Sequence, residues 1–117
     1  MPAPLAHLLF VAALWFGLGW ATPVHAQSAA PLPSWTVTIS DGVFSPKRLE
    51  VPAGQRIKLI LENQGPGPLE FENADLHVEK ILAAKAESFV VITLPPGEHM
   101  FVDEFNIATG ELLIVAR

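Results

Sequence analysis

Short stretches in which apolar and polar residues alternate, each ended by turn-forming residues, constrain this chain more than any other feature. In residues 35–40, tryptophan, valine and isoleucine alternate with threonine and serine, and in residues 55–62 aliphatic residues recur at every second position. A period of two is typical of a β-strand that buries one face. The pattern therefore predicts strands whose apolar faces pack on one another.

Further extended segments follow at intervals of roughly ten residues. We predict strands at residues 48–51, 87–94, 98–105 and 111–116. We expect residues 87–94, which are β-branched and apolar, to be buried on both faces. Residues 69–86 are ambiguous, since a short strand at 70–72 is followed by either a helical turn or an irregular loop. Six or seven strands with proline- and glycine-rich turns predict an all-β sandwich with Greek-key connections.

The N-terminal region indicates export. Residues 8–20 are apolar and uncharged, but the run is too short to cross a bilayer comfortably, which takes about 20 residues. It matches the core of a signal peptide, and small residues at Val24 and Ala26 predict cleavage after Ala26. An uncleaved anchor is the alternative, because the first seven residues contain no lysine or arginine. The predicted organisation is a signal peptide over 1–26, a flexible leader over 27–34 and one domain over 35–117.

The charged residues all lie at or beyond Asp41, and they give the chain a net charge of -5. This acidic balance argues against nucleic acid or an anionic membrane surface as a partner. It suits a cation or a basic protein, although an ordinary solvated acidic surface has the same signature. There is no cysteine, so a disulfide, a zinc–thiolate site and a thiol nucleophile are excluded. No nucleophile–base pair is visible either, and we predict no catalytic residues.

Several motifs occur in an order that resembles bacterial cupredoxins. They are Asp41-Gly42-Val43-Phe44-Ser45-Pro46 with the later Pro52-Ala53-Gly54, the strand ending at Asn63, the turn Pro95-Pro96-Gly97 followed by Phe101, and residues 110–115. The acidic segments resemble more closely the EfeO-type cupredoxin-like group, small periplasmic proteins associated with bacterial iron uptake. They are Glu70-Phe71-Glu72, Asp75-Leu76, Glu79-Lys80 and residues 103–106. The resemblance implies a cupredoxin-like Greek-key β-sandwich.

The resemblance also locates the positions of a copper site. Blue copper needs two imidazoles and a thiolate, with a weak axial ligand. In the resembled family the thiolate comes six residues after the glycine of the Pro-Gly turn, which is Asp103 here, and the second imidazole comes at Asn106. The first imidazole comes near Glu70. The resemblance therefore implies no blue-copper centre, and oxygen donors that suit Cu(II), Fe(II), Fe(III), Mn(II) or Ca(II) instead.

Residues 70–79 hold four carboxylates and one imidazole. We predict a metal site built from Glu70, Asp103, Glu72, Glu79 and His77. The alternative is a solvated acidic loop, partly balanced by Lys80 and Lys85.

Alternation along residues 98–105 places Asp103 on the inward side, where a carboxylate must be paired, hydrogen-bonded or metal-bound unless strand twist exposes it. Glu104 then faces outward and is a poor ligand candidate. Met100, Trp35 and the phenylalanines beyond the signal are predicted to be core residues.

The resemblance implies an exported periplasmic metal-binding accessory protein for iron or copper handling. It would work beside an inner-membrane iron permease or a periplasmic iron-binding protein, without membrane insertion after signal cleavage. Assistance to ferrous-iron oxidation is part of that hypothesis, and a ferroxidase in its own right is a weaker one. A metal-free cupredoxin-fold module for protein–protein interaction is the alternative from another class.

Overall fold

The computed structural model describes residues 2, 17, 19, 20 and 30–117. Of the predicted signal peptide, residues 1–26, only residues 2, 17, 19 and 20 are among those described. The predicted cleavage after Ala26 lies outside the described residues. Among the described residues there is no helix long and apolar enough to span a bilayer.

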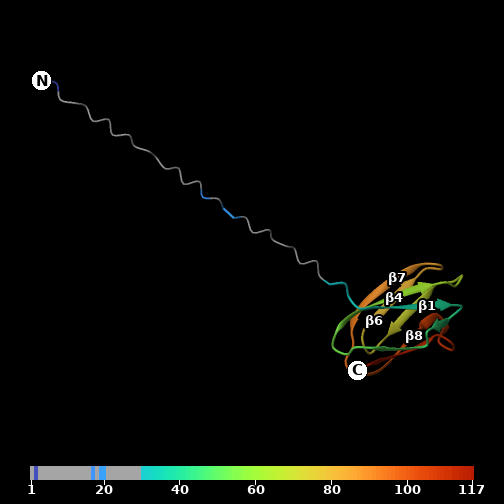
Figure 1. Cartoon of the computed structure of the whole chain (residues 1–117). Helices are drawn as coiled ribbons and strands as arrows, with labels where there is room; N and C mark the ends of the chain where they lie inside the picture. The colour runs from blue at the N-terminus through green and yellow to red at the C-terminus, as the bar shows by residue number, and fades with distance from the viewer. Residues whose placement is uncertain (1, 3–16, 18, 21–29) are drawn as a thin grey trace.

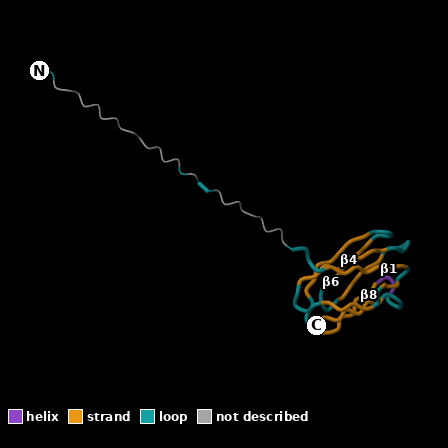
Figure 2. The backbone as a smooth tube through the Cα atoms, in the orientation of Figure 1, coloured by secondary structure: helices purple, strands orange, loops and turns teal. Residues whose placement is uncertain are grey.

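Two β-sheets pack face to face in residues 34–116 (Figure 1). The strands of the first sheet, in spatial order, are β2 (Val43–Ser45), β1 (Ser34–Ser40), β4 (Arg56–Asn63) and β7 (Glu87–Thr93). Those of the second sheet are β3 (Arg48–Val51), β9 (Glu111–Ala116), β8 (Gly97–Asp103), β5 (Leu69–Asn73) and β6 (Val78–Leu82). One short 3-10 helix, η1 (Glu104–Asn106), follows β8 (Figure 2). The predicted all-β sandwich is confirmed.

Both sheets are mixed. β1 runs parallel to β4 and β3 runs parallel to β9, whereas the other neighbours are antiparallel. The chain leaves the first sheet after β4, forms the hairpin of β5 and β6 in the second sheet, and returns to the first in β7. These crossings wrap the sheets around a single core, as expected of Greek-key connections.

Alternating apolar side chains from both sheets fill the core. Ile57, Leu59 and Leu61 of β4 are fully buried, as the alternation predicts. Phe71 and Phe101 stack in the second sheet with ring centroids 4.8 Å apart, and Phe44 packs on Phe71 at 6.1 Å. Aromatic pairs of this kind contribute about 0.5–1.5 kcal/mol beyond the area they bury.

Some local predictions are wrong. Residues 69–86 contain the β5–β6 hairpin rather than a helical turn. Strand β7 lies at an edge and pairs with β4 alone, so its side chains are half-buried or exposed rather than buried on both faces. Phe89, Phe105 and Met100 are exposed and not part of the core. Met100 lies on the outer face of β8, because alternation with the buried Phe101 turns it outward.

Candidate functional site

Asp103 ends β8 and faces the interior of the sandwich, opposite Phe71 of β5. Its side chain is fully buried. Oδ1 accepts hydrogen bonds from the backbone N–H groups of Glu70 and Phe105, both at 3.1 Å. Oδ2 accepts one from the side-chain amide of Asn106 at 2.9 Å. The inward orientation predicted from alternation is confirmed, and hydrogen bonds satisfy the carboxylate.

The loop after η1 folds back onto the same carboxylate. The backbone N–H of Asp103 donates to the carbonyl of Gly110 at 2.9 Å, and the N–H of Gly110 donates to the carbonyl of Asn106 at 2.8 Å. The hydroxyl of Thr109 donates to the carbonyl of Gly42, in the β1–β2 turn, at 2.9 Å. We call this end of the sandwich, around Asp103, Asn106 and Gly42, the pole.

Asn63 holds the loop that forms the other side of the pole. Its amide nitrogen donates to the carbonyls of Gly67 at 2.9 Å and Ala83 at 3.0 Å. Its amide oxygen accepts from the N–H of Gly65 at 3.1 Å. A cavity of about 270 Å³ remains between these loops, and its lining includes Asn63, Pro66, Asp103 and Asn106.

Four glutamates gather around β5 on the outer face of the second sheet. Alternation along β5 turns Glu70 and Glu72 away from the core, and Glu79 of β6 lies directly opposite Glu72. Glu104 of η1 follows Asp103 and interacts with Glu72. We call these four residues, Glu70, Glu72, Glu79 and Glu104, the carboxylate face.

Partial burial and neighbouring carboxyl groups perturb the pKa values of two of these glutamates. Partial burial and then a hydrogen bond with Glu79 raise the pKa of Glu70 above its ordinary value of 4.5. A hydrogen bond with Glu104, followed by partial burial, raises the pKa of Glu72 above the same value. Neighbouring carboxylates disfavour each other's ionised form, and in both cases this repulsion adds to the effect of partial burial on the pKa.

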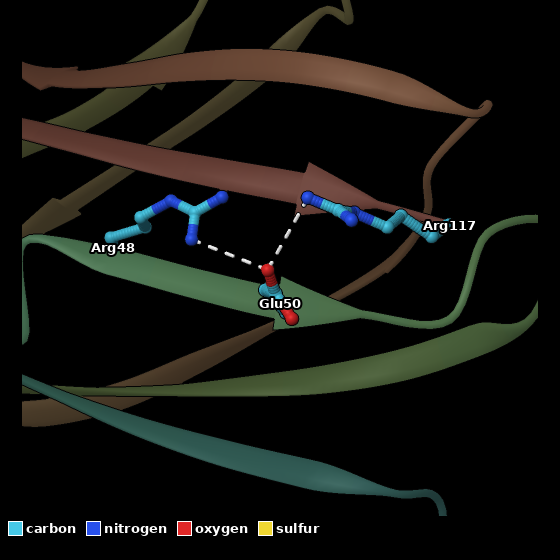
Figure 3. A network of polar contacts seen from close by, with 3 residues as sticks. All are labelled: Arg48, Glu50 and Arg117. Atoms are coloured by element: carbon cyan, nitrogen blue, oxygen red, sulfur yellow. Dashed lines mark hydrogen bonds and ion pairs between the residues drawn. The ribbon is translucent and has the colours of Figure 1, made fainter.

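No basic side chain neutralises the carboxylate face within the described part of the chain. The ion pairs found there both involve Glu50 of β3, which contacts Arg48 at 3.2 Å and Arg117 at 3.4 Å (Figure 3). That network lies at the opposite edge of the second sheet, because β3 and β6 are its outermost strands. None of the four glutamates is therefore ion-paired with a lysine or arginine in that part of the chain.

The structure divides the predicted metal site into separate places. It brings Glu70, Glu72 and Glu79 together on the carboxylate face. Asp103 meets Glu70 through the backbone N–H of Glu70, while alternation turns the Glu70 side chain to the outer face. His77 is exposed in the β5–β6 turn, which lies beyond Asn73, at the far end of β5 from Leu69 and the pole.

Glu104 is rejected as a ligand from the sequence, because the metal site is expected inside the sandwich and Glu104 is predicted to face outward. The outward face of β5 is the useful signal. The predicted short strand at 70–72 already places Glu70 and Glu72 on one side. Recognition of β6 as the next strand would add Glu79 to that side.

The pole does not fit a blue-copper centre. Blue copper requires a thiolate, and the residue in that position, Asp103, has both oxygens engaged by N–H donors. Among the residues that the structure describes, no three histidine, aspartate or glutamate side chains are arranged to hold a metal ion. The donor set of the pole therefore cannot form the copper–thiolate bond on which blue-copper chemistry depends.

A two-sheet sandwich with this strand order and this pole is a cupredoxin-type fold. The chain belongs to the cupredoxin-like domain family, whose family model matches residues 8–115. It is 34% identical over 82 residues to an uncharacterized protein of Rickettsia prowazekii (strain Madrid E). That match covers 69% of this chain and 66% of the relative, so the chain spans slightly less than two thirds of the relative's length.

Solved structures share the fold at low sequence identity. The metal-binding domain of the Cu(I)-exporting P-type ATPase CopA of Streptococcus pneumoniae D39 has a TM-score of 0.64 at 11% identity, over 72% of this chain and 84% of that one. Reduced auracyanin of Roseiflexus castenholzii has a TM-score of 0.58 at 12% identity, over 75% and 99%. A purple cupredoxin of Nitrosopumilus maritimus has a TM-score of 0.53 at 14% identity, over 70% and 98%. These similarities establish the fold.

Proposed function

We propose that this protein is an exported, periplasmic accessory protein of metal handling that binds a hard cation, iron or Cu(II), on its carboxylate face. In this proposal the signal peptide is removed after Ala26, and the domain works beside an iron-uptake permease or a periplasmic iron-binding protein. The EfeO-type likeness of the acidic segments supports the iron assignment. Membership of the cupredoxin-like family supports a metal-related role.

One observation carries the proposal. Four glutamate carboxyls gather on one face, and two of them have raised pKa values because of partial burial and of their carboxyl neighbours. Carboxylate oxygens are preferred ligands of hard cations. A cation bound between the carboxylates of the Glu70–Glu79 and Glu72–Glu104 pairs would offset the repulsion that contributes to the raised pKa values of Glu70 and Glu72.

The chemistry expected of this face is binding and release. An exposed site on the outside of a sheet leaves coordination positions for water or for a ligand from a partner. The face is open, so a cation bound there is accessible to an acceptor protein. In the described part of the chain no three of these carboxylates are already arranged to hold an ion, so the glutamate side chains would reorient around the bound cation. Carboxylate donors suit ferric iron as well as divalent cations.

Calorimetric titration with matched variants tests the proposal. Fe(II) under anaerobic conditions, Mn(II) and Cu(II) are titrated in turn into the exported protein, into the E72Q/E79Q variant and into E62Q/E87Q. The control removes another pair of glutamates that lie directly opposite one another, in the first sheet. We expect dissociation constants below about 1 mM, a binding free energy of roughly -4 kcal/mol or better. We expect E72Q/E79Q to weaken binding about tenfold or more and E62Q/E87Q to leave it within about twofold.

Failure to bind any of these cations at millimolar concentration would contradict the proposal. Equal weakening in both double variants would show attraction by net charge rather than a site.

A metal-free module for protein–protein interaction is the second candidate function. It is favoured by the hydrogen bonds that satisfy the polar side chains of the pole without an ion. Asp103, Asn106 and Asn63 are hydrogen-bonded within the protein, and no buried side-chain nitrogen or oxygen among the described residues lacks a partner. A scaffold completed in this way needs no ion to fold. Absence of cation binding, together with unchanged stability in a chelator, would make this second function the better account.

A further inference from the structure

Asp103 is the one charged residue with a buried side chain within residues 30–117. A carboxylate in such a place requires a cation, a metal ion or several N–H donors. No lysine or arginine in the described part of the chain lies within ion-pairing distance of it. Its partners are three N–H groups, from the backbone of Glu70, the backbone of Phe105 and the side chain of Asn106.

These three donors belong to different parts of the pole. Glu70 lies near the start of β5, and Phe105 and Asn106 belong to η1, for which Asp103 is the N-terminal cap. Asn106 in turn packs on the β1–β2 turn, since a Cβ on Gly42 would lie 2.5 Å from the Asn106 Cβ. One carboxylate therefore connects β5, β8, η1 and the β1–β2 turn.

The packing around this carboxylate is tight. A Cβ added at Gly110 would lie 2.7 Å from the Asp103 Cβ and 2.9 Å from the carbonyl oxygen of Asn106. Asn106 presents its amide nitrogen to Asp103, and an amide N–H group donates a hydrogen bond but does not bind a metal ion. Asp103 and Asn106, which occupy two ligand positions of a blue-copper site in the resembled family, are therefore hydrogen-bonded to each other.

We infer that the Asp103 carboxylate replaces a metal ion as the cross-link of this pole, so that the pole is complete in the metal-free protein. A metal ion at such a pole would hold several loops together by ligand bonds. Here three N–H···O bonds to one carboxylate hold the corresponding segments. The inference does not depend on the proposed cation site, because it concerns residues of the pole and not of the carboxylate face.

Hydrogen exchange at two amides tests the inference directly. The protein is expressed from its full-length chain and examined by NMR, first in EDTA and then with added Cu(II) or Zn(II). The exchange rates of the Glu70 and Phe105 backbone amides are measured in each condition. We expect both amides to be protected in EDTA, with rates changed by less than about twofold on metal addition. In D103A we expect protection to fall by about 100-fold or more, because two backbone donors and the Asn106 amide lose their acceptors.

A second pair of variants keeps the test decisive where D103A does not fold. D103N retains an oxygen for the two backbone amides but turns its nitrogen toward the nitrogen of Asn106. In D103N/N106D the amide and the carboxylate are exchanged, and the side-chain hydrogen bond is restored with reversed direction. We expect D103N to lower the folding equilibrium constant about tenfold, and the double variant to recover most of that loss.

Two results would overturn the inference. One is a pole whose Glu70 and Phe105 amides exchange freely in EDTA and become protected on addition of Cu(II) or Zn(II). The other is a D103N/N106D variant no more stable than D103N. Neither result bears on the carboxylate face, and a failure of cation binding by that face leaves the inference intact.

Discussion

The side-chain amide of Asn106 donates a hydrogen bond to the carboxylate of Asp103 at 2.9 Å. The family resemblance assigns these two positions to the thiolate and the second imidazole of a copper site. In this protein they bond to each other inside the fold. Hydrogen bonds within the protein therefore satisfy the pole that holds the ion in a blue-copper protein, and the carboxylate face lies on the outer side of the second sheet.

The first prediction concerns the space beside Asp103. Gly110→Ala places a methyl group 2.7 Å from the Asp103 Cβ and 2.9 Å from the Asn106 carbonyl oxygen, and hydrogen bonds hold both residues in place. We expect the free energy of unfolding to fall by about 1–3 kcal/mol, as measured by urea denaturation. Gly67→Ala is the control, because a Cβ there meets no atom within 4 Å, and its effect should stay within about 0.5 kcal/mol. Equal effects of the two substitutions would refute the tight packing.

The second prediction separates backbone conformation from packing in the β1–β2 turn. Gly42 and Gly54 have similar left-handed φ angles, 71° and 69°, but only Gly42 has a neighbour in the way, the Asn106 Cβ at 2.5 Å. Gly54→Ala should cost about 1–2 kcal/mol for the backbone alone. Gly42→Ala should cost about 1–3 kcal/mol more. The same loss in both variants, in thermal or urea unfolding, would show that Asn106 moves aside freely.

The third prediction concerns the pH dependence of stability. The pKa values of Glu70 and Glu72 are raised in the folded protein, so both groups favour the folded state most when protonated. Their contribution is fully present below the ordinary value of 4.5 and is lost as the pH rises through the raised pKa values. E70Q/E72Q should therefore be more stable than the wild type at about pH 7, with a difference that shrinks toward about pH 4. Urea denaturation across this range checks the trend, and a difference that grows on acidification would have the wrong sign.

The sequence is sufficient for the fold because the strand signals are local. Alternation in residues 35–40 and 55–62, and turns at Pro-Gly motifs, predict most strands and the sandwich. The inward orientation of Asp103 follows from parity along β8 alone. The error at residues 87–94 arises because a strand's place in its sheet decides exposure, and nothing local distinguishes the edge strand β7 from a central one.

The candidate site is harder to predict because it depends on which side of a sheet each residue occupies. Glu70 and His77 are close in sequence and are therefore predicted to share a site. In the β5–β6 hairpin they lie at opposite ends of β5. Glu70 and Asp103 both lie near ligand positions of the copper site in the resembled family, so the prediction places them together. Their side chains lie on opposite faces of the second sheet. The contribution of Glu104 depends on the turn of η1 after β8, which sequence alternation alone does not encode.

A single NMR titration tests the central claim, that cations bind the carboxylate face while the pole is closed by the protein itself. The side-chain carboxyl ¹³C signals are followed as Zn(II), a diamagnetic stand-in for Fe(II), is added to the protein. We expect saturable shifts at Glu70, Glu72, Glu79 and Glu104, and a stationary signal for Asp103. A shift centred on the Asp103 carboxyl, or no saturable shift at the four glutamates, would contradict it.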